Sequence, residues 1–393
     1  MNVLFFMKCM HIGGQESVTI TLANYFILKG HNISIVSFEK PWDAAVKKTD
    51  SAVHFYTLGE FKYSRDNVLK LSRVLRDEKV DVVINQWGLP YVPAKVLKEA
   101  IKKSKLNIKS IAVYHNDPCM NARVTDVDIA LHSCSNSLKR ILLLGKKFLF
   151  KKITSKSMRY VYNHSDQYLV LSPSHIEHFR SFTGIKNLNR INSLANPLTV
   201  DPKDYEYKFD NKQKEIVYCG RIDFNQKRVC RVIETWALLE SSFPDWRLTI
   251  VGDGESRNDV ESLAKSLKLK RVCFEGFQNP VKYYQRASIL LLTSEYEGFG
   301  LVLIEGMCFG VVPCVYGSYS AVYDIVEDEK NGIIVEKTEN GLFSAKKMAN
   351  RLAEVMSDGK VRDAMAQNAI ETSKFYSIDC IYQQWMDNLN RLL

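Results

Sequence analysis

The chain has 393 residues, 46% of them hydrophobic and 25% charged, which is the composition of a folded globular protein long enough for two domains. No apolar run is long enough to span a membrane, and the nine cysteines are scattered without a Cys-x-x-Cys pair, which argues against a disulfide framework or a structural zinc site. A cytoplasmic protein is therefore expected, and the net charge of +10 indicates an anionic partner such as nucleic acid, anionic lipid or a phosphorylated substrate.

In chain order, short apolar strands alternate with amphipathic helices. The first half predicts strands at 3–6, 32–38, 80–85, 111–113 and 167–171 and helices at 17–29 and 68–78. A polar stretch at 196–214 without periodicity is interpreted as a linker. The second half predicts strands at 215–219, 247–251, 272–274, 289–293 and 311–315 and helices at 229–239, 259–266 and 378–393. This alternation predicts an α/β protein with two Rossmann-like, doubly wound parallel-sheet domains, at 1–198 and 199–377.

Two loops after predicted strands are suited to anions, and ligands of an open parallel sheet bind beyond the carboxyl ends of its strands. Gly13 and Gly14 follow the first strand, where backbone N–H groups and a helix start favour an anion. Arg221 and Lys227 follow the first strand of the second domain. They could converge on a diphosphate, the arginine as a fork and the lysine as a point charge.

Two carboxylates, Glu297 and Glu305, bracket a Gly-Phe-Gly turn between strand 289–293 and a helical pattern. A strand, a glycine turn and a helix start suit a phosphate, and the carboxylates could hold hydroxyl groups of an attached sugar. Glu305 lies in an apolar helix, where an unpaired carboxylate is costly. We therefore predict a ligand site here.

Three further segments are weaker candidates. His115 follows strand 111–113 at the same predicted edge of the sheet. Gly252 follows strand 247–251 and either lies near a nucleotide or only makes a turn. The sequence 126–128 is an Asp-x-Asp pattern without a third ligand at a telling spacing, and we interpret it as structural.

These loops, in this order and spacing, resemble the retaining glycosyltransferases of family 4, which have the GT-B fold of two Rossmann-like domains facing across a cleft. The resemblance covers nearly the whole chain and is strongest at 218–221, at 246–254 and at Glu297-Gly-Phe-Gly-Leu-x-x-x-Glu305, the family's E-x7-E signature. It implies transfer of a sugar from a nucleotide-diphosphate sugar, such as a UDP- or GDP-sugar, to a glycan or polyprenyl-diphosphate-linked acceptor in bacterial surface polysaccharide synthesis. It also implies that helix 378–393 completes the first domain.

The resemblance assigns roles position by position. Glu305 would bind the ribose of the donor and Glu297 the transferred sugar, while Arg221 and Lys227 would neutralise the diphosphate as it leaves. The other implied site residues are Phe299 and Gly300 at the sugar pocket, the backbone of Gly300, Leu301 and Val302 at the phosphates, Gly252 near the nucleotide, Gly13 and Gly14 under the phosphates or acceptor, and His115 at the reacting centre. Neither a metal nor another cofactor is expected.

The segment 316–324 departs from the Gly-Gly-Pro-Glu-like turn that many family members have, Arg228 stands where glycine is common, and Gly306 stands where alanine is usual. These departures leave the identity of the sugar open.

A basic and apolar segment, 138–160, carries eight lysines and arginines, no acid, and leucines and phenylalanines between them. Such a helix is typical of binding to an anionic membrane surface, and the alternative is a solvated basic face. We expect the first domain to be peripheral on the inner face of the membrane, near a polyprenyl-diphosphate acceptor.

Two other functions are weighed. A GT-B-like sugar-nucleotide epimerase would need acid and base carboxylates from the first domain, and none is identified. A nucleic-acid-binding protein would spread its charge along a groove with stacking aromatics, whereas here it is concentrated beside apolar residues. No nucleic-acid partner is therefore expected, and a dehydrogenase is disfavoured because no G-x-G-x-x-G follows the first strand.

Overall fold

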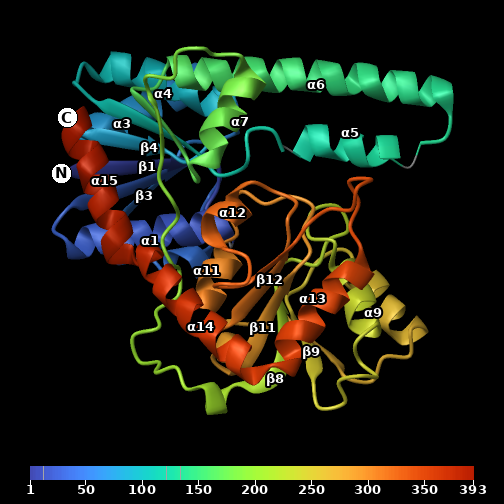
Figure 1. Cartoon of the computed structure of the whole chain (residues 1–393). Helices are drawn as coiled ribbons and strands as arrows, with labels where there is room; N and C mark the ends of the chain where they lie inside the picture. Colours follow the sequence, from blue (N-terminus) through green and yellow to red (C-terminus); the bar gives the residue numbers. More distant parts are fainter. Residues whose placement is uncertain (12, 121, 133) are drawn as a thin grey trace. The chain divides into compact units, whose positions relative to one another are not determined.

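The computed structural model describes residues 1–11, 13–120, 122–132 and 134–393. The chain forms two compact units: unit 1 comprises Met1–Thr199 and Ile378–Leu393, and unit 2 comprises Val200–Ser377 (Figure 1). Each unit is built on its own parallel sheet. The polar stretch after Asn196 therefore crosses from one unit to the other.

Unit 1 holds a seven-stranded sheet in the order β3-β2-β1-β4-β5-β6-β7. Its strands are β1 (Asn2–Met7), β2 (Asn32–Ser37), β3 (His54–Thr57), β4 (Val82–Asn85), β5 (Lys109–Tyr114), β6 (Gln167–Val170) and β7 (Ile191–Ser193). Its helices are α1 (Gly14–Leu28), α2 (Asp43–Val46), α3 (Arg65–Asp77), α4 (Tyr91–Ser104), α5 (Ala122–His132), α6 (Ser137–Asn163), α7 (Ser174–Thr183) and α15 (Ile378–Leu392). No helix of the described residues is both long and apolar enough to cross a membrane.

Unit 2 holds a six-stranded sheet in the order β10-β9-β8-β11-β12-β13. Its strands are β8 (Gln213–Cys219), β9 (Arg247–Val251), β10 (Val272–Gly276), β11 (Ala287–Leu292), β12 (Val312–Tyr316) and β13 (Ile333–Val335). Its helices are α8 (Val229–Ala237), α9 (Arg257–Ser266), α10 (Val281–Arg286), α11 (Leu301–Met307), α12 (Ala321–Ile325), α13 (Ala345–Ser357) and α14 (Gly359–Ser373), with short 3-10 turns at Phe209–Asn211 and Lys374–Tyr376.

The central strands are mostly apolar because helices cover both faces of a parallel sheet. Residues 3–7 of β1 and all of β11 are buried. In unit 1, Val3 pairs in register with Ile33 of β2 on one side and Val82 of β4 on the other. These central strands were predicted from their apolar runs, whereas β3, β7 and β13 were not predicted because they have only three or four residues and no long apolar run.

The last helix, α15, packs on α1 within unit 1. Tyr382 lies edge-on to both Tyr25 and Phe26 of α1, at ring-centroid distances of 5.2 and 5.1 Å. The Tyr382 hydroxyl lies 2.8 Å from Nε2 of His31, and Trp385 is buried. The aromatic face of α15 therefore becomes part of the core of unit 1.

Candidate active site

In unit 2 all strands are parallel, and the direction in which successive strands are added to the sheet changes between β8 and β11. From β8 the strands proceed outward to β9 and β10, and from β11 they proceed the other way to β12 and β13. The loops that leave β8 and β11 at their carboxyl ends therefore part from each other, which leaves a crevice for a ligand at this switch point. The β8 loop carries Arg221 and Lys227, and the β11 loop carries Glu297.

Lys227 and Glu297 form an ion pair across these two loops. Lys227 Nζ lies 2.6 Å from Glu297 Oε1, and the side chains are only 15% and 8% exposed. The Ser294 hydroxyl donates to the same carboxylate oxygen at 2.6 Å. Two opposite charges are thus held close together with little water around them, where electrostatic interactions are strong. The sequence predicted both residues as site residues but did not predict that they pair.

Asp223 fixes the backbone of the β8 loop and was not predicted. Its buried carboxylate accepts hydrogen bonds from the backbone N–H groups of Gln226 at 2.7 Å and Lys227 at 3.0 Å. The backbone carbonyl of Gln226 in turn accepts from the backbone N–H of Glu295 at 2.7 Å, and the Gln226 side-chain amide donates to the carbonyl of Tyr296 at 3.3 Å. The two loops are therefore tied together. The signal in the sequence is an aspartate three residues before a backbone N–H group that it binds, which is the spacing of an N-cap residue.

Arg221 lies on the same loop but has other partners than Lys227. Its guanidinium donates to Asp223 at 2.9 Å and to Gln226 at 3.0 Å, and its side chain is 64% exposed. Arg221 and Lys227 therefore share no partner in this structure, and their convergence on one anion stays a prediction. The exposed guanidinium keeps donors available in addition to those that Asp223 and Gln226 receive.

Glu305 is buried on α11, as its apolar neighbours suggested. The Tyr284 hydroxyl donates to its Oε2 at 3.3 Å, and Leu303 and Ile304 beside it are fully buried. Phe299, also buried, packs edge-on against Tyr376 at a centroid distance of 5.6 Å. Leu301 and Val302 are the first two residues of α11 and are partly buried.

At Gly300 the backbone conformation of the turn requires glycine. Its φ is +99°, in the region that side chains rarely adopt. A Cβ atom there would lie 2.9 Å from the hydroxyl of Tyr319, so the segment after β12 approaches the turn closely. Tyr319 was not singled out as a site residue, although it lies in the segment that departs from the family pattern.

Gly252 has a structural reason to be glycine. Its φ is +144°, and a Cβ atom would stand 1.8 Å from the carbonyl oxygen of Gly220. The N–H of Gly220 donates to the carbonyl of Val251 at 3.0 Å. Gly252 therefore lets the β9 loop pack closely on the β8 loop.

In unit 1 the switch point lies between β1 and β4, where an amide and an imidazole meet. The Gln15 amide donates to the carbonyl of Gln86 at 2.7 Å, and Nε2 of His115 lies 2.6 Å from Oε1 of Gln86. Burial lowers the pKa of His115 to about 4, so its imidazole is neutral near pH 7. Gly13 precedes α1 in ordinary extended conformation, with φ −165°, and Gly14 is the first residue of α1.

Groups of possible metal ligands among the described residues occur in unit 1, at Cys9, His11 and Glu39 and at Asp117, Cys119 and His178. The Asp117 carboxylate already accepts hydrogen bonds from His178 at 2.8 Å and from the backbone of Cys119 at 2.8 Å. Of the Asp-x-Asp pattern, Asp128 forms an ion pair with Lys147, a structural partner of the kind expected for this pattern.

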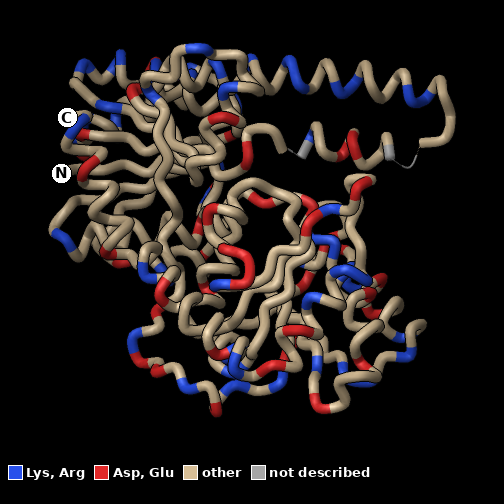
Figure 2. Tube along the Cα trace, viewed as in Figure 1, with Lys and Arg blue, Asp and Glu red and all other residues tan. Residues whose placement is uncertain are grey.

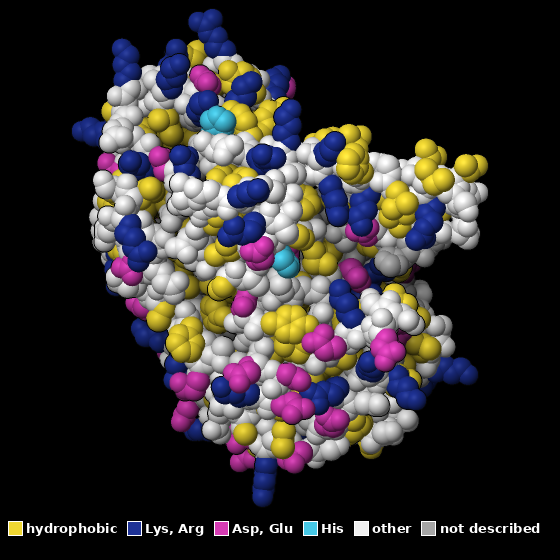
Figure 3. Space-filling view, turned by 45° about the horizontal axis from the view of Figure 1, so that its top comes forward, with side chains coloured by type: hydrophobic (Ala, Val, Ile, Leu, Met, Phe, Trp, Pro, Cys, Tyr) yellow, Lys and Arg dark blue, Asp and Glu magenta, His cyan; other side chains and the backbone are white. Residues whose placement is uncertain are grey.

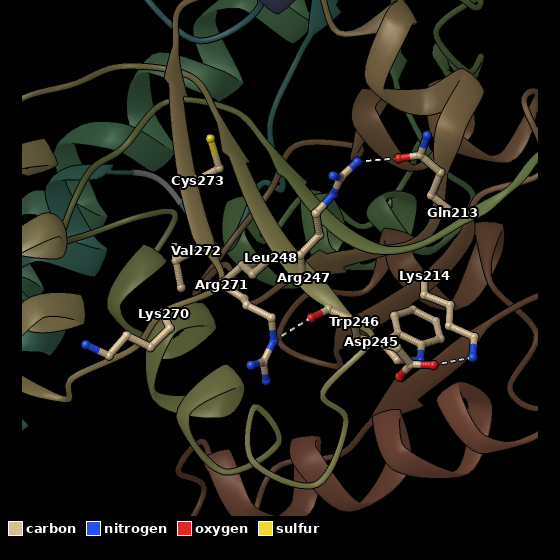
Figure 4. Close-up of a pocket in the computed structure, with 10 residues that line it drawn as sticks. All are labelled: Gln213, Lys214, Asp245, Trp246, Arg247, Leu248, Lys270, Arg271, Val272 and Cys273. Carbon is tan, nitrogen blue, oxygen red and sulfur yellow. Dashed lines mark hydrogen bonds and ion pairs between the residues drawn. The ribbon is translucent and has the colours of Figure 1, made fainter.

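A hollow of about 410 Å³ lies at the other end of the unit 2 sheet (Figure 4). Its lining residues are Gln213, Lys214, Asp245, Trp246, Arg247, Leu248, Lys270, Arg271, Val272 and Cys273, at the amino ends of β8, β9 and β10. Lys214 pairs with Asp245, Arg247 with Gln213, and Arg271 donates to the carbonyl of Trp246. Because parallel sheets bind ligands at their carboxyl ends and these cations are engaged, the hollow is not the active site.

Two Rossmann-like units on parallel sheets are the architecture of the GT-B class. The structure superposes on that of Anabaena HepE in complex with UDP and glucose with a TM-score of 0.75 and 15% identity, covering 100% of both chains. It superposes on the lipopolysaccharide outer core galactosyltransferase WaaB with a TM-score of 0.71 and 20% identity, also over 100% of both chains. At these identities the likeness establishes the fold.

The chain belongs to the group 1 glycosyltransferases. The model "Glycosyl transferases group 1" matches residues 201–372, and the model "Glycosyltransferase Family 4" matches residues 12–200. An uncharacterized glycosyltransferase of Haemophilus influenzae is 27% identical over 390 residues, 97% of each chain. The predicted fold and reaction class are therefore confirmed: the chain is a GT-B glycosyltransferase.

A second relative, from Campylobacter jejuni, is 25% identical over 391 residues, 98% of this chain and 97% of its own. It is named GalNAc-alpha-(1->4)-GalNAc-alpha-(1->3)-diNAcBac-PP-undecaprenol alpha-1,4-N-acetyl-D-galactosaminyltransferase. Another, from Erwinia amylovora, is named for amylovoran biosynthesis and is 24% identical over 96% of both chains. The relatives of this chain thus include enzymes named for bacterial polysaccharide and lipid-linked glycan synthesis.

Proposed function

We propose that the enzyme transfers a sugar from a nucleoside-diphosphate sugar to a glycan hydroxyl with retention of configuration, and that the unit 2 switch point binds the donor. The Lys227–Glu297 ion pair carries this proposal. An enclosed ion pair often contributes little to stability because desolvation offsets its attraction. A functional reason for keeping these charges is that a donor presents both diphosphate oxygens for the lysine and hydroxyl groups for the carboxylate.

In this proposal Lys227 turns from Glu297 toward the diphosphate and Arg221 joins it there with its exposed guanidinium. As the bond between the sugar and the diphosphate breaks, negative charge grows on the leaving oxygen. Cations positioned beforehand stabilise that charge more than they stabilise the neutral bond, and so lower the barrier. Charge neutralisation by these two side chains removes the need for a divalent metal, so we expect activity to survive EDTA.

Glu305 is assigned to the ribose of the donor. Its carboxylate has two oxygens, of which Oε2 accepts from Tyr284, and a carboxylate offers about four acceptor positions in all. A carboxylate can accept hydrogen bonds from two vicinal hydroxyl groups at once, which is the pair of groups that a ribose offers. Glu297, paired with Ser294, is assigned to hydroxyl groups of the transferred sugar.

A donor screen by thermal unfolding tests this assignment. A nucleotide sugar at about 100 times its Kd should stabilise the wild type by roughly 2.7 kcal/mol, and candidate UDP- and GDP-sugars are compared. Glu305→Gln keeps the size of the side chain and removes one acceptor oxygen and the charge, so its response should be much weaker. If no nucleotide sugar stabilises the wild type, or if Glu305→Gln responds equally, the proposal fails.

The acceptor is proposed to be a polyprenyl-diphosphate-linked glycan at an anionic membrane, which unit 1 contacts through α6. Figure 1 shows α5 and α6 side by side, reaching beyond the sheet of unit 1. Figure 2 shows lysines and arginines along the whole of α6. Only its second half carries buried residues: Thr154, Met158, Val161 and Tyr162.

The first half of α6 exposes large apolar side chains. Leu138 is 75% exposed, Leu142 73% and Phe148 61%, and the others are Ile141, Leu144, Leu149 and Ile153. Most follow the three- and four-residue spacing that places side chains on one side of a helix. Yellow and dark blue side chains lie interspersed over this arm in Figure 3, an arrangement that suits a surface of acyl chains and anionic headgroups.

Flotation with vesicles tests the membrane contact. Each lysine near an anionic surface contributes about 1 kcal/mol, so replacing Lys146, Lys151 and Lys152 by glutamine should weaken binding to anionic vesicles on the order of 100-fold. The matched control replaces three exposed lysines at the end of α4, Lys102, Lys103 and Lys105, and should bind as the wild type does. Equal binding to neutral vesicles, no binding, or equal loss in the control would refute the contact.

A second pair of variants separates membrane from nucleic acid. Phe148→Ser with Leu149→Ser removes apolar area without changing charge, so it should weaken vesicle binding. Salt-sensitive binding of random DNA that this double variant leaves unchanged would favour a nucleic-acid partner instead.

A further inference from the structure

Tyr319 holds a buried hydroxyl group that has no hydrogen-bond partner in the described residues. The residue is 3% exposed and lies between β12 and α12, in the segment where the sequence departs from the family pattern. A buried polar group without a partner costs free energy that phenylalanine would not cost, and buried polar groups in native structures are otherwise almost always paired. The hydroxyl therefore calls for an explanation other than packing.

The position of this hydroxyl links it to the donor site of unit 2. It stands 2.9 Å from where a Cβ atom of Gly300 would be, in the turn between the two signature glutamates. The preceding residue is anchored to the same loop, because the Ser318 hydroxyl donates to the carbonyl of Ser294 at 2.6 Å. Burial, followed by the negative charge of Glu297, raises the pKa of Tyr319 well above its usual range, so the hydroxyl stays protonated and can donate.

We propose that the Tyr319 hydroxyl hydrogen-bonds to a hydroxyl group of the donor's transferred sugar and so selects among sugars. The inference rests on the proposed function, since it assigns a partner within the same donor site. The hydroxyl is enclosed in the donor-free protein, so side chains around Gly300 shift when the donor enters. Lys227, which the donor draws away from Glu297, supplies one such movement.

Selection follows from the cost of an unpaired group. A donor whose sugar places a hydroxyl at this position gives Tyr319 a partner, and a donor that lacks it leaves the phenol buried and unpaired. Sites built to pair with a substrate hydroxyl reject analogues without that group much more strongly than apolar pockets reject an extra methylene.

The decisive variant is Tyr319→Phe, which keeps the ring and removes only the hydroxyl. Without donor, its melting temperature should equal that of the wild type or exceed it by up to about 3 °C, because an unpaired polar group has been removed. With the donor identified by the screen, its KM should rise about three- to tenfold, the worth of one neutral hydrogen bond. The deoxy donor that lacks the paired hydroxyl should show no difference between the two proteins.

The matched control is Tyr283→Phe on α10, another buried tyrosine of unit 2. Its hydroxyl is paired, with Glu275 at 2.8 Å, and α10 enters the sheet at the amino end of β11. This variant should melt at a lower temperature and keep the KM of the wild type. The two substitutions thus remove the same atom and shift stability and KM in different directions.

The outcomes distinguish the sources of failure. If the wild type responds to donors and Tyr319→Phe has the same KM for every donor, the inference is overturned while the proposed function stands. If Tyr319→Phe also loses stabilisation by the nucleoside diphosphate alone, the hydroxyl contacts phosphate and the sugar assignment is overturned. If the wild type responds to no nucleotide sugar, the proposed function and the inference fall together.

Discussion

Both sheets have a switch point, where the direction in which successive strands are added changes. It lies between β1 and β4 in unit 1 and between β8 and β11 in unit 2, and the side chains at the two switch points differ. In unit 2 they are charged: Lys227 pairs with Glu297, and Arg221 extends into solvent. In unit 1 an amide of Gln86 contacts an imidazole that burial keeps uncharged, while the charged Lys8 after β1 pairs with Glu39 after β2.

This difference separates what the backbone determines from what the side chains determine. Topology places a crevice at the carboxyl ends of the strands in each unit. The side chains then decide whether the crevice can hold an anion. The ion pair of unit 2 suits the diphosphate of the proposed donor, and the uncharged contact between Gln86 and His115 in unit 1 suits a hydroxyl group, which needs orientation more than it needs charge.

The largest effect is expected from Lys227→Ala. Removing one group that stabilises charge in a transition state typically lowers turnover about 10²–10³-fold, so kcat/KM with the donor should fall by that amount. Stability should also fall by about 3 kcal/mol, because Glu297 would be left buried without its cation. Steady-state kinetics and thermal unfolding measure the two effects separately.

Lys214 at the amino end of β8 provides the control within the same sheet. It pairs with Asp245, and both side chains are more than half exposed. Exposed pairs contribute about 0–1 kcal/mol, so Lys214→Ala should leave activity unchanged and stability nearly so. The double variant Lys227→Ala, Glu297→Gln should recover stability but not activity, and recovery of activity would show that Lys227 acts only as a structural partner.

A second prediction compares the glycines of the two units. Gly252→Ala should destabilise by roughly 3 kcal/mol or prevent folding, because its φ is positive and the added atom meets the backbone of Gly220. At Gly13 an added Cβ meets only the end of the Glu16 side chain at 2.6 Å, which can rotate away. Gly13→Ala should therefore cost less than about 1 kcal/mol in thermal unfolding.

Gly13→Ala also tests a role in the site. If the backbone at Gly13 approaches the phosphates or the acceptor, kcat/KM should drop while stability holds. An unchanged kcat/KM would show that Gly13 has no role in the site beyond preceding α1.

Much of the fold could be predicted because its signals are local. A strand such as 287–292 can be predicted from a short apolar run. A run bounded by polar residues is enough when both faces of the sheet are buried. The start of a helix and a positive φ are less visible. Arg228, at a position where glycine is common in the family, adopts φ +51° before α8. The residues around Arg228 do not predict this conformation.

The site was predicted in its residues more than in its contacts. Glu297 and Lys227 are 70 residues apart in the chain, so their pairing depends on β8 and β11 being neighbours, which no local pattern states. Asp223 and Ser294 escaped notice for a related reason: they act on other residues of the site through hydrogen bonds. The hydroxyl of Tyr319 could not be predicted because its lack of a partner exists only in the folded chain.

The smallest predicted effect is a pH dependence of stability that arises from His115 at the unit 1 switch point. Burial lowers the pKa of His115 from 6.5 to about 4, so between these values the unfolded chain binds a proton that the folded one does not. The free energy of unfolding therefore falls as pH drops from 6.5 toward 4, and above 6.5 His115 contributes no pH dependence. Because His115 is half-buried, its contribution to this change in the free energy of unfolding is roughly 2 kcal/mol. The measurement is the difference in unfolding free energy between the wild type and His115→Gln at several pH values. This difference should move against the wild type as pH falls, and a constant difference would show that the imidazole is not kept neutral.

Kinetics give an independent check: since His115 is already neutral at pH 6, it should produce no break in kcat/KM near pH 6.5. A break there that His115→Gln abolishes would mean that this switch point, too, works with charge.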